Sequence, residues 1–160
     1  MSLIHDRNSA SWEIATLFRW VVIYNIRNQI GSHFGVIEQR VSLCGNAGQQ
    51  FLCQPTMLRV ETSASILTGR ASVSTKLSVP INHFEGNYTC DSGTLARLRD
   101  GDRIVLRYVD NPNGSVDGIA GVCSEGRNVV GLMLHPERAC SKLLGSADGA
   151  VLLCSLLDAA

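Results

Sequence analysis

Neither sign of charge is in excess in this chain, and no run of lysines or arginines occurs. The 160 residues carry 14 basic and 14 acidic side chains, which gives a formal net charge of zero at pH 7. Proteins that bind nucleic acid or anionic membranes usually present a basic patch or stripe. We therefore expect no nucleic-acid and no membrane partner, and favour a small molecule or another protein.

Cysteine pairs at metal-binding spacings are also missing. The cysteines form no C-x-x-C pair and no ligand spacing, so we expect reduced thiols in a cytoplasmic protein and no bound metal. No glycine-rich phosphate loop occurs either, and we expect no cofactor. The six cysteines are Cys44, Cys53, Cys90, Cys123, Cys140 and Cys154.

No hydrophobic run in the sequence is long enough to cross a bilayer. The longest, residues 14–26, contains Arg19 and Asn25 and falls short of the ~20 apolar residues that a spanning helix needs. The hydrophobic content of 45% nevertheless supports one sizeable core, and the chain length favours a single domain.

Strand patterns become regular after Asn46. Because proline cannot donate a hydrogen bond to a strand ladder, we expect a break at Pro55 and an edge strand or strand end at Pro80. The turn-forming residues 110–115 predict a loop, and residues 124–127 predict a hairpin turn. Apolar and β-branched runs predict strands at residues 51–60, 77–81, 103–109, 118–123 and 128–134.

Two helices are expected in the same part of the chain. Asp91 or Ser92 can cap a short helix that ends at residues 100–102 and carries Leu95 and Leu98 on one face. Ser146 or Asp148 can cap a final helix. The buried stripe of that final helix is expected to contain Val151, Leu152, Leu156 and Leu157.

The sequence His135-Pro136-Glu137 follows the last strand pattern directly. A histidine with a carboxylate two residues later, held by the proline between them, supplies two parts of a nucleophilic triad: a base and the group that orients it. A solvated surface pair is the alternative reading. The triad's third part, the nucleophile, is not evident nearby.

Another pair, His83 and Glu85, repeats the same spacing. It follows a strand that ends near Pro80 and Ile81, and we expect a structural or substrate-proximal loop there rather than direct chemistry. His5 and His33 lie in the first 45 residues and are expected to have no role.

Several segments of the chain resemble one known family in order and spacing. The most specific feature is an Asn-Pro-Asn-Gly-Ser loop followed by His-Pro-Glu-Arg, a far narrower pattern than H-x-E alone. The family is the glutamine amidotransferase subunit of phosphoribosylformylglycinamidine synthase, a class I amidotransferase of purine biosynthesis. The resemblance covers about residues 46–160, through segments 46–53, 83–88, 107–115, 118–123 and 135–139.

This resemblance implies an α/β chain that forms the C-terminal half of a flavodoxin-like amidotransferase fold. It also implies glutamine hydrolysis to glutamate and ammonia by a Cys-His-Glu triad in which His135 is the base and Glu137 orients it. The implied partners are glutamine, the large synthetase subunit that uses ATP to form the amidine, and a small accessory subunit. ATP belongs to the synthetase, so the resemblance implies no cofactor here.

The nucleophile of the family lies on a strand-to-helix elbow of the form G-x-C-x-G-x-Q, upstream of the matched region. Such an elbow lifts the sulfur above the sheet and points a helix N-terminus at it. Cys44 lacks the preceding glycine and stands too close to Asn46. Cys123 is followed by a strand pattern, and we expect a buried thiol at a strand end. We therefore expect the chain to lack its cysteine nucleophile.

Residues 1–45 do not resemble the N-terminal half of the family, and we expect them to form an unmatched leader before a partial amidotransferase domain at residues 46–160. Without the family's first strands, Val105, Ile119 and Val129 are expected to be partly wet, with Trp20–Tyr24 as a substitute strand. Two departures stand near the site: Phe84, which we expect to crowd the glutamine pocket, and Leu134.

Three functions follow from this sequence. The first is a partial glutaminase subunit that is silent alone. The second is a non-catalytic docking module that binds the synthetase subunit. The third is an unrelated α/β enzyme that uses His135 and Glu137 with water or a metal, against which the absence of clustered ligands counts.

Overall fold

A computed structural model describes residues 41–159 of the chain. These residues form a five-stranded sheet in the order β3-β2-β5-β6-β7, and a separate two-stranded ribbon of β1 and β4. Every strand pair is antiparallel. The strands are β1 (Val41–Gly45), β2 (Leu52–Val60), β3 (Lys76–His83), β4 (Glu85–Cys90), β5 (Ile104–Tyr108), β6 (Ile119–Cys123) and β7 (Val130–Leu132).

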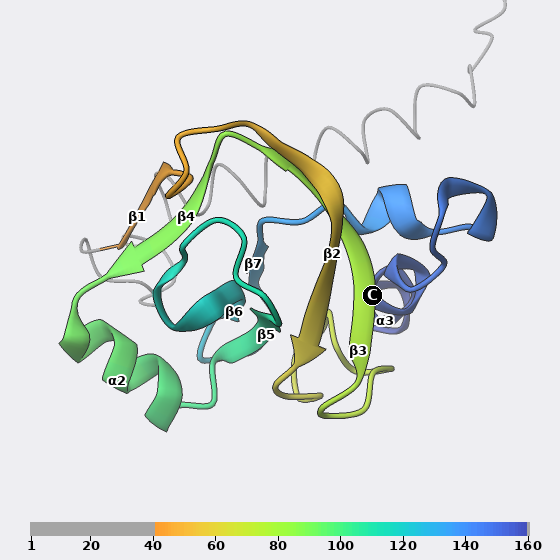
Figure 1. Ribbon diagram of the computed structural model, residues 1–160. Coiled ribbons are helices and arrows are strands. Elements are labelled where there is room, and N and C mark those ends of the chain that lie inside the picture. Colours follow the sequence, from red (N-terminus) through yellow and green to blue (C-terminus); the bar gives the residue numbers. More distant parts are fainter. Residues whose placement is uncertain (1–40, 160) are drawn as a thin grey trace, which may run out of the picture.

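Strands β2 and β3 form the long, curved pair at one side of the sheet, and the chain continues from β3 into β4 through a single bend at Phe84 (Figure 1). The expected break at Pro55 is wrong: β2 runs unbroken through it. Pro55 lies directly opposite Pro80, and the Pro80 carbonyl points away from β2, toward the N–H of His135. The two prolines therefore form a non-hydrogen-bonded pair, and no hydrogen bond between them is lost. The expectation that Pro80 marks an edge strand is confirmed, because β3 is the first strand of the sheet.

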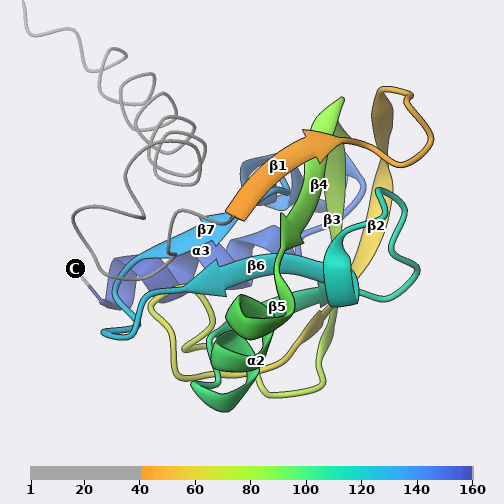
Figure 2. The ribbon, with the colours of Figure 1, turned by 90° about the vertical axis from the view of Figure 1, so that its left-hand side faces the viewer.

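The two helices lie on opposite sides of the sheet, α2 (Ser92–Asp100) on one and α3 (Gly149–Asp158) on the other (Figures 1 and 2). Helix α2 starts as expected, because the carboxylate of Asp91 accepts a hydrogen bond from the backbone N–H of Thr94 at 2.9 Å. Three short 3₁₀ turns complete the fold: η2 (Val116–Gly118), η3 (Pro136–Ala139) and η4 (Lys142–Leu144).

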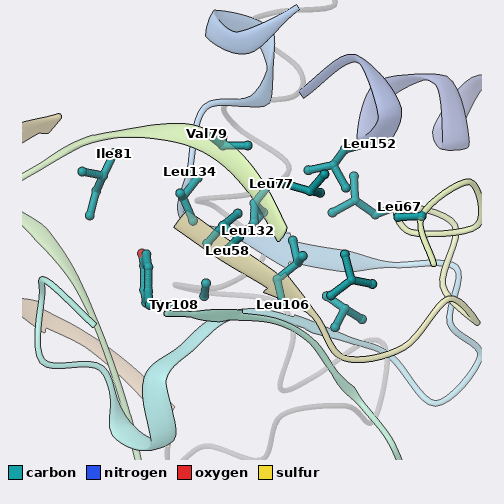
Figure 3. Close-up of a cluster of buried hydrophobic side chains, with 14 of the residues drawn as sticks. Leu58, Leu67, Leu77, Val79, Ile81, Leu106, Tyr108, Leu132, Leu134 and Leu152 are labelled. Atoms are coloured by element: carbon teal, nitrogen blue, oxygen red, sulfur yellow. The ribbon is translucent and has the colours of Figure 1, made fainter. Parts of the chain in front are cut away.

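Each face of the sheet has its own apolar cluster. The larger cluster joins Leu58 of β2 and Leu106 of β5 to Leu152 of α3 (Figure 3). The smaller one packs Leu98 of α2 against Ile119 and neighbouring side chains. Burial on this scale, at about 25 cal/mol per Å² of apolar surface, is the main force that holds the sheet between its helices.

Three expectations about burial need correction. Val105 and Ile119 are not wet: their exposed fractions are 0% and 1%, because the two clusters cover both faces of the sheet. Val129 is half-buried, so the expectation that it would be partly wet is confirmed. Leu157 does not join the buried stripe of α3; it is 76% exposed, because it points about 140° away from Leu152 around the helix.

Strand β1 lies within the first 45 residues, which we expected to form a leader. All five residues of β1 pair with β4. Trp20–Tyr24, the expected substitute strand, lies outside the described residues. Within residues 41–159, no helix combines the length and the apolar character that crossing a membrane would require.

Candidate functional site

His135 lies at the start of a short turn that follows β7. Met133 and Leu134 are buried below it, and Pro136 begins the 3₁₀ turn η3 with the fixed backbone angle that a helical start needs. The backbone N–H of His135 donates a hydrogen bond to the carbonyl oxygen of Pro80 at 3.1 Å. The turn is therefore anchored to edge strand β3.

The side chains of His135 and Glu137 are in contact, as expected from their spacing. His135 Nδ1 lies 2.8 Å from Glu137 Oε1, and the two side chains are 18% and 52% exposed. Because a carboxylate can only accept, the ring carries its proton on Nδ1 and leaves Nε2 free to take a proton from another group.

The pKa of Glu137 is lowered from its ordinary value. Burial alone would raise this pKa, but hydrogen bonds from His135 and from the backbone outweigh it, with help from the charges of His135 and Arg138. Glu137 is therefore ionised at neutral pH, which is the state an orienting carboxylate requires.

Helix α3 packs against the turn. A Cβ added at Gly149 would overlap the carbonyl oxygen of Pro136 and lie 2.9 Å from that of Ala139, so only glycine lets the helix start this close. The thiol of Cys140 also donates to the Pro136 carbonyl, at 3.1 Å.

His83, the second candidate histidine, lies at the end of β3. Its ring covers Gly86 so closely that a Cβ there would overlap it. Both ring nitrogens are buried and have no hydrogen-bond partner among residues 41–159. Burial, followed by the nearby charge of His135, lowers the pKa of His83 to about 4. His83 is therefore neutral at pH 7, and the charge of His135 contributes to this. Glu85, by contrast, is exposed at the start of β4.

Sequence reasoning missed two buried asparagines that hold the loops around His83. Asn46 donates from Nδ2 to the carbonyl oxygens of Gln50 and His83 at 2.8 and 2.9 Å. Asn113 is fully buried, and its Nδ2 donates to the carbonyl oxygen of Gly86 at 2.6 Å. The backbone carbonyl oxygen of Asn113 accepts a hydrogen bond from the backbone N–H of Ala47. The succession of turn formers at residues 110–115 marked the loop but not its burial.

Neither cysteine weighed as a nucleophile lies on an elbow. Cys44 is on β1, with its sulfur 3.7 Å from the hydroxyl of Thr89. Cys123 is buried at the end of β6, where burial raises the pKa of its thiol, and the chain turns from it into β7, as expected. Among the residues that the structure describes, Glu137 is the only hydrogen-bond partner of the His135 ring.

Other departures from the family pattern can be located. Phe84 is 46% exposed, and its ring lies against Gly45. Leu134 is buried in the larger apolar cluster. In the described part of the chain, no three His, Cys, Asp or Glu side chains gather as a metal site would need.

Comparison with known proteins identifies close relatives. Residues 21–148 match the family model of the CobB/CobQ-like glutamine amidotransferase domain. The chain is 51% identical over 119 residues to the phosphoribosylformylglycinamidine synthase subunit PurQ of Rubrobacter xylanophilus, covering 74% of this chain and 54% of the relative. The subunit of the same name from Koribacter versatilis is 48% identical over 117 residues, covering 68% of this chain and 51% of the relative.

A solved structure is also similar. The structure of PurLQS from Thermotoga maritima matches with a TM-score of 0.69 and 31% identity, over 92% of this chain and 66% of that chain. The chain spans about half the length of the curated relatives it matches.

Proposed function

Because the chain belongs to the CobB/CobQ-like glutamine amidotransferase family, we propose that it is a partial glutaminase subunit of phosphoribosylformylglycinamidine synthase that lacks its cysteine nucleophile. Its fold is the α/β fold of class I glutamine amidotransferases. The observation that carries the proposal is the 2.8 Å contact between His135 and Glu137, inside the residues 21–148 that match the family model. The family match leaves the third hypothesis, an unrelated enzyme, without support.

We further propose that residues 46–160 correspond to the C-terminal half of a flavodoxin-like fold. A flavodoxin-like sheet is mainly parallel, whereas every described strand pair here is antiparallel. The parallel strands, the glycine-rich elbow and its cysteine would then belong to the N-terminal half that other family members carry.

In this proposal, His135 and Glu137 do the proton transfers of glutamine hydrolysis. His135 Nε2 takes the proton of an attacking thiol and then gives it to the departing ammonia. Glu137 holds the ring by its Nδ1–H and stabilises the imidazolium that forms. Without a thiol at Nε2, the first bond to the amide carbon does not form.

The test is glutamine hydrolysis by the purified chain, measured as ammonia release. We expect no ammonia above a blank without protein. Turnover that disappears in Cys44→Ser would show that this chain has a nucleophile and would contradict the proposal.

A second candidate function is a docking module for the synthetase and accessory subunits, PurL and PurS. Two observations favour it. The loops around Asn46 and Asn113 are held by buried hydrogen bonds, and no described thiol reaches His135. Co-elution with PurL and PurS in size-exclusion chromatography is expected, and separate elution would remove this candidate.

A further inference from the structure

Arg138 follows Glu137 on η3 and reaches back to edge strand β3. With its amide oxygen turned toward the guanidinium, Asn82 accepts hydrogen bonds from Nη1 at 2.6 Å and from Nη2 at 3.2 Å. The opposite amide orientation would set the NH₂ group of Asn82 against a guanidinium that can only donate, so the oxygen faces Arg138. One side-chain oxygen thus receives two arms of the same guanidinium.

This contact is the second of two links between η3 and β3. The first is the backbone hydrogen bond from His135 to the Pro80 carbonyl at 3.1 Å. Pro80 and Asn82 are two residues apart on β3. His135 directly precedes the turn, and Arg138 is its third residue. The two links therefore fix the rotation of the turn as well as its position.

The rotation of η3 decides whether Glu137 meets His135. The turn is four residues long, and 3₁₀ turns of this length have little stability of their own. The Glu137 side chain is 52% exposed, so little packing holds it in place. Without the second link, the backbone contacts at Pro80 and Gly149 would still hold the start of the turn, but the carboxylate would leave Nδ1 for solvent more readily.

We propose that Arg138 and Asn82 form a clamp that positions the His135–Glu137 pair, a role that rests on the proposed glutaminase function. Neither residue acts on glutamine directly. Arg138 is exposed, so its loss costs little folding stability. The clamp acts on orientation: it keeps the His135 ring protonated on Nδ1 and Nε2 free.

The test is the tautomer of His135, read from ¹⁵N chemical shifts of the full chain at about pH 8.5, where an ordinary imidazole is neutral. In the unmodified chain the Nδ1–H form should dominate. Arg138→Gln and Asn82→Leu should each lower the ratio of Nδ1–H to Nε2–H by about threefold or more, the effect of weakening one hydrogen bond. Asn82→Asp should keep the ratio, because a carboxylate also accepts both guanidinium arms.

Arg127→Gln is the matched control, since this arginine bonds to Asp102 and Gly101 and does not touch η3. Glu137→Ala is the reference for a lost acceptor, because alanine has no side-chain oxygen to face Nδ1. An unchanged ratio in Arg138→Gln and Asn82→Leu, while Glu137→Ala changes it, overturns the clamp. So does an equal change in Arg127→Gln or in Asn82→Asp. If Glu137→Ala itself changes nothing, the acid-base pair of the proposed function fails instead, and the clamp with it.

Discussion

The ring nitrogens of His83 are buried and have no hydrogen-bond partner in the described part of the chain, and the pKa of His83 falls from 6.5 to about 4. As the pH falls, His83 takes up its proton in the unfolded chain before it does so in the folded chain. Its contribution to the free energy of unfolding is therefore complete above pH 6.5 and is lost as the pH falls through 4. The shift corresponds to roughly 3 kcal/mol of unfolding free energy, which solvent at the partly exposed ring reduces to about 1–2 kcal/mol.

His83→Phe should therefore flatten the decline of stability between about pH 7 and pH 4 by about 1–2 kcal/mol. The aromatic ring fills similar space over Gly86 and removes the unpartnered nitrogens, so stability at pH 7 should not fall. Urea unfolding at several pH values measures this. A variant whose stability declines with acid as steeply as the unmodified chain would show that His83 is not responsible.

At the scale of single residues, the sequence predicted the His135–Glu137 contact because both partners lie within three residues and a proline fixes the backbone between them. Their catalytic role stays a proposal. Asn46 and Asn113 could not be found in this way. Their partners His83 and Gly86 lie 27 to 37 positions away in the chain, so only the folded structure makes them buried and bonded.

Helix α3 and η3 meet at Gly149, and this contact allows a test at the scale of elements. Alanine normally favours a helix over glycine by up to about 1 kcal/mol. Here the added Cβ overlaps the Pro136 backbone, so Gly149→Ala should instead destabilise the chain by about 1–3 kcal/mol. The same substitution at Gly48, which has no atom within 4 Å of an added Cβ, is the control and should change stability little. Equal unfolding midpoints for the two variants would contradict the close contact.

The loop at residues 110–115 supports the turn between β3 and β4 through Asn113. Asn113→Ala would leave the buried carbonyl of Gly86 without this donor, and we expect a loss of about 2–3 kcal/mol in unfolding free energy. Asn128→Ala, at an exposed turn position, should cost less than about 1 kcal/mol. Thermal unfolding compares the two, and a similar small loss at both sites would contradict the role assigned to Asn113.

Most strands were predictable because their apolar alternation is local. Alternation and turn formers predicted the hairpin between β6 and β7, and Asp91 marked the start of α2. The break expected at Pro55 was wrong because a proline interrupts a ladder only where its N–H would face the paired strand. That direction depends on the pairing of Pro55 with Pro80, which lies 25 positions later. The short 3₁₀ turns have no apolar period and were not predicted.

At the scale of the whole molecule, the order of the strands depends on pairings between distant segments. The expectation that Val105 and Ile119 would be wet assumed that the strands of the family's N-terminal half alone cover the sheet. The described residues cover both positions themselves, with α2 and the β1–β4 ribbon on one side and α3 on the other (Figure 2). The chain therefore has two apolar clusters of its own while spanning about half of its relatives.

We propose that His135 and Glu137 form an acid-base pair for amide hydrolysis, and no thiol of the residues that the structure describes reaches His135. The most direct measurement is intact-mass spectrometry after treatment with an electrophilic diazoketone analogue of glutamine. Such a reagent alkylates a cysteine that is placed to attack the side-chain amide of bound glutamine. The account predicts no adduct that added glutamine prevents. A stoichiometric adduct on a single cysteine, suppressed by glutamine and lost in His135→Ala, would contradict it.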